Sequence, residues 1–280
     1  MTGKRPNAGR GGNITEFPRR TEGVGFAYLS RMKRLPIGLQ DFRKIREDDY
    51  LYVDKTEQIF RLTQYGNYCF YSRPRRFGKS MTISTLHELY RGHRQLFEGL
   101  WIENHWDWTR KHPVVWLRFA VMGEQTIGLA AGIVKQLREI GTDYNLTLEN
   151  DDPVGTFSEL IRRLHDQAGR MVLLIDEYDK PLVDYLNDPE RLEDNRRLLR
   201  AFYSVVKDSD RYLEFFFLTG VSAFSKVSLF SALNNLENIS LEAVGETLTG
   251  ITETEIDTYL TPYLEPFDRE QLRHSTSPSS

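Results

Sequence analysis

The chain has 280 residues, of which 40% are hydrophobic and 28% are charged, and its net charge of -3 gives no sign of a bulk attraction to nucleic acid or anionic membrane. No stretch approaches the ~20 apolar residues of a membrane span, which excludes a transmembrane protein. The single cysteine, Cys69, rules out an intrachain disulfide, and the amino terminus lacks the apolar core of a signal peptide, so we expect a cytoplasmic protein.

The first 31 residues differ from the rest of the chain. They are rich in glycine and scattered basic residues and hold few apolar side chains. Such a segment cannot bury enough apolar surface to offset the entropy lost on ordering. We predict that residues 1–31 form a disordered basic tail and that the folded part begins near Met32.

Apolar runs and helical patterns alternate along the middle of the chain. The runs predict strands at residues 68–71, 113–119, 171–175 and 212–218. Helices are predicted from a capping-box-like start at Asp54-Lys-Thr-Glu57 and over residues 81–90, 127–140, 153–168 and roughly 189–207. Strands separated by helices imply an α/β fold with a parallel sheet covered on both faces.

The run Arg73-Pro-Arg-Arg-Phe-Gly-Lys-Ser80 links the first predicted strand to a helix, which is the order of a phosphate-binding loop. Backbone N–H groups at a helix start point at an anion, and the helix dipole favours negative charge there. Gly78 lets the backbone approach the phosphates, Lys79 can reach the β- and γ-phosphates, and Ser80 can ligate Mg²⁺. The match is incomplete, because the full pattern has glycine where this chain has Arg73.

The loop carries arginines in place of further glycines. Arg73, Arg75 and Arg76 suit bidentate phosphate contact, and we expect at least one of them to touch phosphate. The alternative is that they face solvent or bind the acidic residues described next. Phe77 and Met81 complete the predicted nucleotide-binding set.

Residues 171–175 are a continuous apolar run of the length and branching expected of a strand buried on both faces. The run ends in Asp176-Glu177, and the carboxyl ends of parallel strands border the crevice where open α/β sheets bind ligands. Asp176 can hold Mg²⁺ together with Ser80, and Glu177 can polarise an attacking water. An ordinary acidic turn is the alternative for this motif alone. Both motifs in this order favour a P-loop ATPase.

Thr219-Gly-Val-Ser222 follows the last predicted strand, where P-loop ATPases of the additional-strand class place a polar sensor. A hydroxyl of Thr219 or Ser222 can hydrogen-bond the γ-phosphate or the attacking water, so both join Glu177 as candidate catalytic residues. A strand-ending turn explains these residues equally well, since Ser, Thr and Gly dominate turns for local reasons.

Several segments together resemble the AAA-ATPase-like domain of a bacterial family. They are Tyr52-Val-Asp-Lys-Thr56, residues 73–80, Leu174-Ile-Asp-Glu-Tyr-Asp-Lys-Pro181 and Phe217-Leu-Thr-Gly-Val-Ser222, with residues 234–241 and 250–256 matching the region that follows. The resemblance covers about residues 35–264. It implies that Arg73 is the family's own variant of the loop. It also implies a three-layer P-loop NTPase sandwich with a mostly parallel sheet of the additional-strand (ASCE, AAA-like) class and a helical C-terminal portion.

Members of that family usually continue into a PD-(D/E)XK nuclease-like domain. Its active site needs an acidic residue two positions before a lysine, and none of the ten lysines of this chain has one. We therefore expect a truncated protein. Its parts are an AAA-ATPase-like domain over residues 32–240, a helical segment over 241–266 that leads to a missing C-terminal domain, and a disordered tail over 267–280.

Three functions fit these features. The first is a Mg²⁺-dependent ATPase that couples ATP binding and hydrolysis to a partner or to the missing domain. The others are a nucleotide-gated interaction scaffold with little turnover and a P-loop small-molecule kinase. Glu177 directly after Asp176 favours the ATPase over the kinase, because a kinase does not need a water-activating carboxylate. ATP and Mg²⁺ are the expected ligands, and nucleic acid or a protein bound through the missing domain is the expected partner. The sequence leaves the oligomeric state open.

Overall fold

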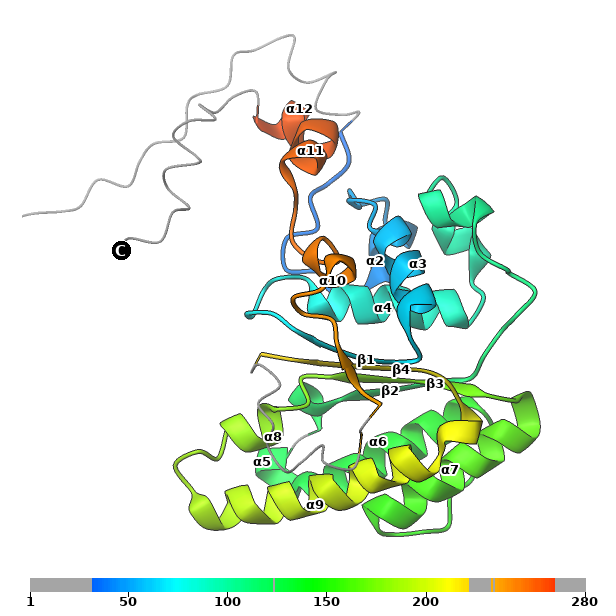
Figure 1. Ribbon diagram of the computed structural model, residues 1–280, viewed down its shortest axis with the longest axis vertical. Helices are drawn as coiled ribbons and strands as arrows, with labels where there is room; N and C mark the ends of the chain where they lie inside the picture. Colours follow the sequence, from blue (N-terminus) through cyan, green and yellow to red (C-terminus); the bar gives the residue numbers. More distant parts are fainter. Residues whose placement is uncertain (1–31, 123, 222–232, 234, 265–280) are drawn as a thin grey trace, which may run out of the picture. The chain divides into compact units, whose positions relative to one another are not determined.

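One sheet of five parallel strands forms the centre of the protein, with the order β2-β3-β4-β1-β5 (Figure 1). The computed structural model describes residues 32–122, 124–221, 233 and 235–264. The strands are β1 (Tyr68–Ser72), β2 (Val114–Arg118), β3 (Met171–Asp176), β4 (Leu213–Gly220) and β5 (Glu237–Asn238). The expected α/β architecture with a parallel sheet is therefore confirmed. Because the strands are parallel, the phosphate loop after β1 and the acidic turn after β3 lie at the same edge of the sheet.

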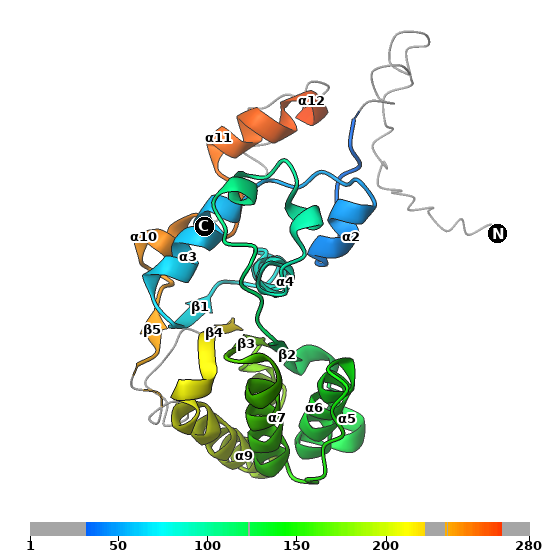
Figure 2. The ribbon, with the colours of Figure 1, turned by 90° about the vertical axis from the view of Figure 1, so that its right-hand side faces the viewer.

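Helices cover both faces of the sheet (Figures 1 and 2). One face carries α2 (Phe42–Glu47), α3 (Thr56–Tyr65) and α4 (Lys79–Tyr90), and the other carries α6 (Leu129–Asp143), α7 (Pro153–Ala168) and α9 (Pro189–Asp208). The shorter helices are α5 (Glu124–Ile127), α8 (Lys180–Val183), α10 (Ala243–Glu246), α11 (Glu253–Glu255) and α12 (Thr261–Leu264). Single turns are η1 (Arg94–Phe97), η2 (Trp101–Asn104), η3 (Phe119–Val121), η4 (Asp210–Tyr212) and the π-helical η5 (Ile256–Leu260). No helix in the described ranges has the length and hydropathy that a membrane crossing requires.

The sheet separates two hydrophobic clusters, one on each face. All six residues of β3 are buried. Leu173 and Ile175 belong to the cluster under α6, α7 and α9, whereas Val172 and Leu174 belong to the cluster under α3 and α4. This two-residue alternation places successive side chains on opposite faces. A strand buried on both faces has to be apolar throughout, which is why its sequence is a continuous run.

Capping residues explain where the long helices begin. Asp152 accepts a hydrogen bond from the Gly155 N–H at the start of α7, with Pro153 in the first turn. Asp188 and Pro189 begin α9 in the same way. Both starts are as predicted from the sequence.

The capping box expected at the start of α3 is wrong in detail. The helix begins at Thr56, one residue later than a cap at Asp54 requires. Asp54 accepts from the N–H and hydroxyl of Thr56 and also from the Trp101 N–H. Glu57 pairs with Arg61 one turn further along the helix, so it does not reach back to the cap.

The helix predicted over residues 127–140, with Gly141 as its stop, is also wrong in its bounds, because α5 ends at Ile127 and α6 runs from Leu129 to Asp143. Gly141 has a different role there. A Cβ atom at this position would lie 3.2 Å from the Leu146 carbonyl oxygen. The glycine therefore lets the chain fold back closely against the last turn of the helix.

Candidate functional site

The phosphate loop joins β1 to the start of α4. Gly78 precedes the first helical residue and has φ of 91°, a left-handed conformation that glycine adopts without strain. Within the described residues no side chain caps this helix start. The first N–H groups of α4 are therefore available to an anion, as the sequence motif predicts.

Lys79 lies inside the loop and only 5% of it is exposed. Its Nζ donates hydrogen bonds to the carbonyl oxygens of Arg73 at 2.8 Å and Pro74 at 3.0 Å. Burial lowers the pKa of Lys79, while the charges of Asp176 and Glu177 act in the opposite direction. Among the described residues, only these backbone carbonyls accept hydrogen bonds from the buried ammonium. It can exchange them for phosphate oxygens, to which charge-assisted hydrogen bonds are stronger.

The three loop arginines differ in their surroundings. Arg73 donates to the carbonyl oxygens of Ser240 at 2.6 Å and Gly245 at 3.2 Å, and its guanidinium lies 4.9 Å from the centre of the Tyr71 ring. The side chain thus connects the loop to residues 240–255, which we call the C-terminal segment. Its contact with phosphate stays a prediction. Arg75 is exposed, and its charge affects the pKa of Lys79.

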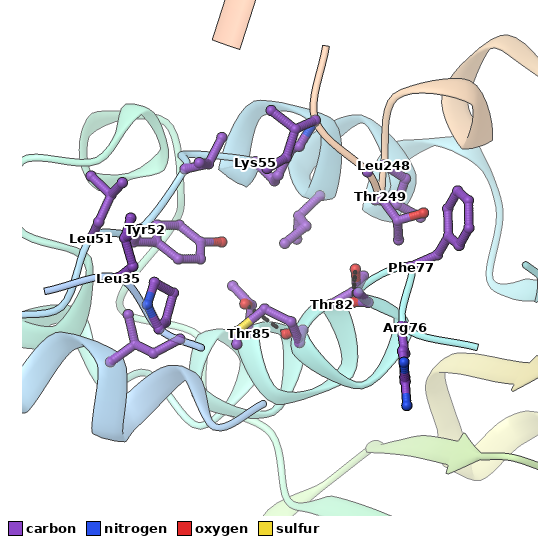
Figure 3. A pocket seen from close by; sticks show the side chains of 18 of the residues that line it. Leu35, Leu51, Tyr52, Lys55, Arg76, Phe77, Thr82, Thr85, Leu248 and Thr249 are labelled. Carbon is purple, nitrogen blue, oxygen red and sulfur yellow. Dashed lines mark hydrogen bonds between the residues drawn. The ribbon is translucent and has the colours of Figure 1, made fainter. Parts of the chain in front are cut away.

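Arg76 is exposed and has φ of 69°, which is uncommon for a residue with a side chain. Its side chain points away from the apolar cavity that lies beside the loop (Figure 3). Arg76 is nevertheless one of the residues that line this cavity, and its contact with phosphate remains a prediction.

Asp176 ends β3 and is 7% exposed. The fully buried Thr219 hydroxyl on β4 donates to Asp176 Oδ1 at 2.8 Å. Thr219 therefore orients the carboxylate, whereas the predicted contact of its hydroxyl with phosphate or water stays a prediction. Ser222, the other candidate in this segment, lies outside the described residues.

Glu177 follows with φ of 56°, an uncommon left-handed conformation for a residue with a side chain. Burial raises its pKa, and the neighbouring charge of Asp176 raises it further. The Tyr178 N–H donates to the Thr219 carbonyl oxygen at 2.9 Å, which fixes this turn against the end of β4. A carboxylate with a raised pKa at the edge of the sheet is suited to accept a proton.

The two motifs meet at a cavity of about 250 Å³, lined in part by Ser80, Asp176 and Glu177. A hydroxyl and a carboxylate oxygen suit Mg²⁺, which proteins bind through a few oxygen ligands together with substrate phosphates. Trp116 and Arg118, at the carboxyl end of β2, line the same cavity. Sequence reasoning missed both, although an arginine near the carboxyl end of a predicted strand was a usable signal.

A second, larger cavity of about 560 Å³ lies on the other side of the helix start and has mainly apolar walls (Figure 3). Gly78, Phe77 and Met81, from the predicted nucleotide-binding set, line it. Tyr52 points its hydroxyl into the space, and Leu248 belongs to the wall formed by the C-terminal segment. Its volume falls in the usual range for small-molecule sites.

The C-terminal segment is attached to this cavity by polar contacts. The Gly250 N–H donates to the Phe77 carbonyl oxygen at 3.2 Å. Lys55 pairs with Glu255 at 2.6 Å and also donates to the Thr247 carbonyl oxygen at 3.1 Å. The segment therefore contacts the phosphate loop and the cavity wall at once.

Comparison with known proteins shows the family of the chain. Residues 36–230 match a family model described as "Predicted AAA-ATPase". A protein of Azotobacter chroococcum mcd 1, described as "Uncharacterized protein in vnfD 5'region", is 44% identical over 254 residues, which cover 86% of this chain and 47% of that protein. The chain thus spans about half the length of this relative. On the family match and this identity, the chain belongs to the family of predicted AAA-ATPases.

Proposed function

We propose that the chain binds Mg²⁺-ATP and hydrolyses it to ADP and phosphate, and that this cycle changes the conformation of a partner or of a further domain. The observation that carries the proposal is the meeting of the two motifs at one edge of the sheet. Asp176 and Glu177 are close enough to Lys79 for their charges to affect its pKa. They line one cavity with Ser80, the residue that follows Lys79.

The proposed roles follow from the contacts. Lys79 exchanges its two loop carbonyls for phosphate oxygens. Ser80 and Asp176 hold Mg²⁺, which supplies charge neutralisation at the phosphates when bound. Glu177 accepts the proton of the attacking water, and Thr219 keeps the Asp176 carboxylate in place.

The apolar cavity beside Gly78 is the proposed site for the adenine base of ATP, close to the loop that would hold the phosphates. Its volume of about 560 Å³ and its mainly apolar walls suit a flat aromatic ring. The strand order supports the additional-strand class of P-loop proteins, because β4 lies between β1 and β3. Cys69, the single cysteine of the sequence, is buried and free, which is compatible with the reducing environment of the cytoplasm.

The runner-up is a nucleotide-gated scaffold with little turnover. The contacts of Arg73 and Phe77 with the C-terminal segment favour it, because they pass a change in the loop to another part of the chain without any hydrolysis. Both functions use the same binding residues, so turnover has to separate them.

The test is release of phosphate from γ-labelled ATP by the purified chain, with Mg²⁺ and with excess chelator, and with and without DNA. Free labelled phosphate that depends on Mg²⁺ supports the ATPase. Tight ATP binding without release supports the scaffold, and label recovered on a small-molecule acceptor supports a kinase. Absence of nucleotide binding in calorimetry contradicts all three.

A further inference from the structure

Arg118 is a charged residue at the candidate site to which no role has yet been given. It ends β2, the strand at the edge of the sheet, and its Cα pairs in register with that of Asp176. Neighbouring strands are about 4.8 Å apart, so the two residues project from adjacent positions at the carboxyl edge. Arg118 lines the same cavity as Ser80 and Glu177.

Two hydrogen bonds from one side chain fix the backbone of Arg118. The nearly buried Gln136 of α6 accepts from the Arg118 N–H at 3.0 Å and donates to its carbonyl oxygen at 2.9 Å. One carboxamide therefore satisfies both outward-facing backbone groups at the end of an edge strand. This fixes the point from which the side chain reaches into the cavity, which is the kind of support that a charge-binding group needs.

The guanidinium itself is exposed and lies 5.1 Å from the centre of the Trp116 ring. Across the described ranges it forms no ion pair with a carboxylate, although Asp176 and Glu177 border the same cavity. Arg73, by contrast, uses its guanidinium on backbone carbonyls. Within the described residues, Arg118 thus keeps its charge and hydrogen-bond donors available at a cavity that it shares with the two carboxylates.

We propose that Arg118 is a catalytic residue that contacts the γ-phosphate of bound ATP from within the same chain; this rests on the proposed ATPase function. On nucleotide binding the guanidinium moves from the Trp116 ring to the γ-phosphate oxygens, which it can bind in a bidentate way. The oxygen of water then forms a bond to the γ-phosphorus, and its proton passes to Glu177. The bond from the γ-phosphorus to the bridging oxygen breaks, and its electron pair remains on the β-phosphate of ADP. Arg118 stabilises the charge on the equatorial oxygens during this step.

The test compares Arg118→Gln and Arg118→Lys with the control Arg211→Gln. Arg211 also stacks on an aromatic ring, that of Tyr212, but it lies just before the amino end of β4, whereas Arg118 lies at the carboxyl end of β2. Calorimetry measures the affinity for a slowly hydrolysed ATP analogue and for ADP, each with Mg²⁺. A second readout is trapping of ADP by aluminium fluoride, which mimics the transferred phosphoryl group.

For Arg118→Gln we expect the affinity for the ATP analogue to fall by ~10-fold or more, the scale of a lost charge-assisted contact, while that for ADP stays unchanged. Trapping by aluminium fluoride is lost, and turnover falls by on the order of 10³-fold. Arg118→Lys recovers part of the analogue affinity, and the control behaves like the original protein.

Two results would overturn the assignment. Equal losses of affinity for the analogue and for ADP would mean that Arg118 supports the site as a whole and not the γ-phosphate. Unchanged affinities and trapping would mean that it has no part in the reaction. If the unchanged protein binds neither nucleotide, the proposed function fails first, so the two failures are distinguishable.

Discussion

The phosphate loop after β1 and the acidic turn after β3 contribute to one site, yet different parts of the chain hold them. The loop is held by the C-terminal segment, through Arg73 to the Ser240 carbonyl oxygen and through the Phe77 carbonyl oxygen to Gly250. The acidic turn is held by its neighbouring strand, through Thr219 to Asp176. The half of the site proposed to bind nucleotide is therefore connected to a distant segment, whereas the half proposed for chemistry is built into the sheet.

In the comparison of these two regions, the largest expected effect separates chemistry from binding at the acidic turn. Glu177→Gln keeps the shape of the side chain but cannot accept a proton, so turnover should fall by ~10²-fold or more, the usual scale for a general base. ATP affinity should stay within a few-fold of the original. Phosphate release and calorimetry on the same preparation measure both, with the exposed Glu190→Gln as control. Turnover that persists would place the base elsewhere.

Lys79→Ala tests the binding half of the site. It removes the buried ammonium, so ATP affinity should weaken by roughly 1.5–3 kcal/mol, the range for hydrogen bonds to charged groups. Calorimetry against Lys207→Ala, an exposed lysine on α9, measures the difference. An unchanged affinity would remove the phosphate loop from the proposal.

Arg73→Ala tests whether the loop depends on the C-terminal segment. It leaves the Ser240 carbonyl oxygen without this donor and removes one of the two donors to the Gly245 carbonyl oxygen, the other being the Tyr71 hydroxyl, which should lower the free energy of unfolding by about 1–2 kcal/mol. Hydrogen exchange over residues 240–250 should accelerate, and ATP affinity should change less than in Lys79→Ala. The exposed Arg61→Ala is the control. A loss of affinity equal to that of Lys79→Ala would instead make Arg73 a phosphate ligand.

The smallest effect concerns pH and the stability of the acidic turn. Burial and the charge of Asp176 raise the pKa of Glu177, so its ionised form disfavours the folded state. This penalty is absent below the unfolded pKa of about 4.3 and complete above the raised folded pKa. Glu177→Gln should therefore increase the melting temperature slightly at pH 7 and leave it unchanged near pH 3.

In the same way, turnover of the original protein should decline as the pH falls through the raised pKa of Glu177. Thermal melts and rate profiles across pH measure the two effects. A destabilising Glu177→Gln at neutral pH would show that the carboxylate makes a net favourable contact in the folded protein.

Much of the fold was accessible from the sequence because its elements carry local signals. The apolar run at residues 171–175 predicted β3, and the helical patterns at residues 153–168 and roughly 189–207 predicted α7 and α9 closely. The strand β5 was missed because two residues give no periodicity. The end of α6 was misplaced because Gly141 serves a close approach to Leu146, a long-range packing effect that looks like a local stop signal.

The sequence by itself determined the two motifs of the candidate site and their order along the chain. The motifs are recognised from the residue types at Lys79 and Ser80 and at Asp176 and Glu177. A phosphate loop and a strand-ending carboxylate depend on local backbone geometry and on side-chain chemistry, both of which act over a few residues.

Only the tertiary structure decided which further groups join the site. It directs Arg73 to the C-terminal segment, Thr219 to Asp176, and Arg118 to the shared cavity. These assignments depend on strand order and register, which bring together residues more than 40 positions apart in the sequence. Side-chain identity alone cannot specify such neighbours, because the same arginine or threonine serves a turn, a surface or a site according to what the fold places beside it.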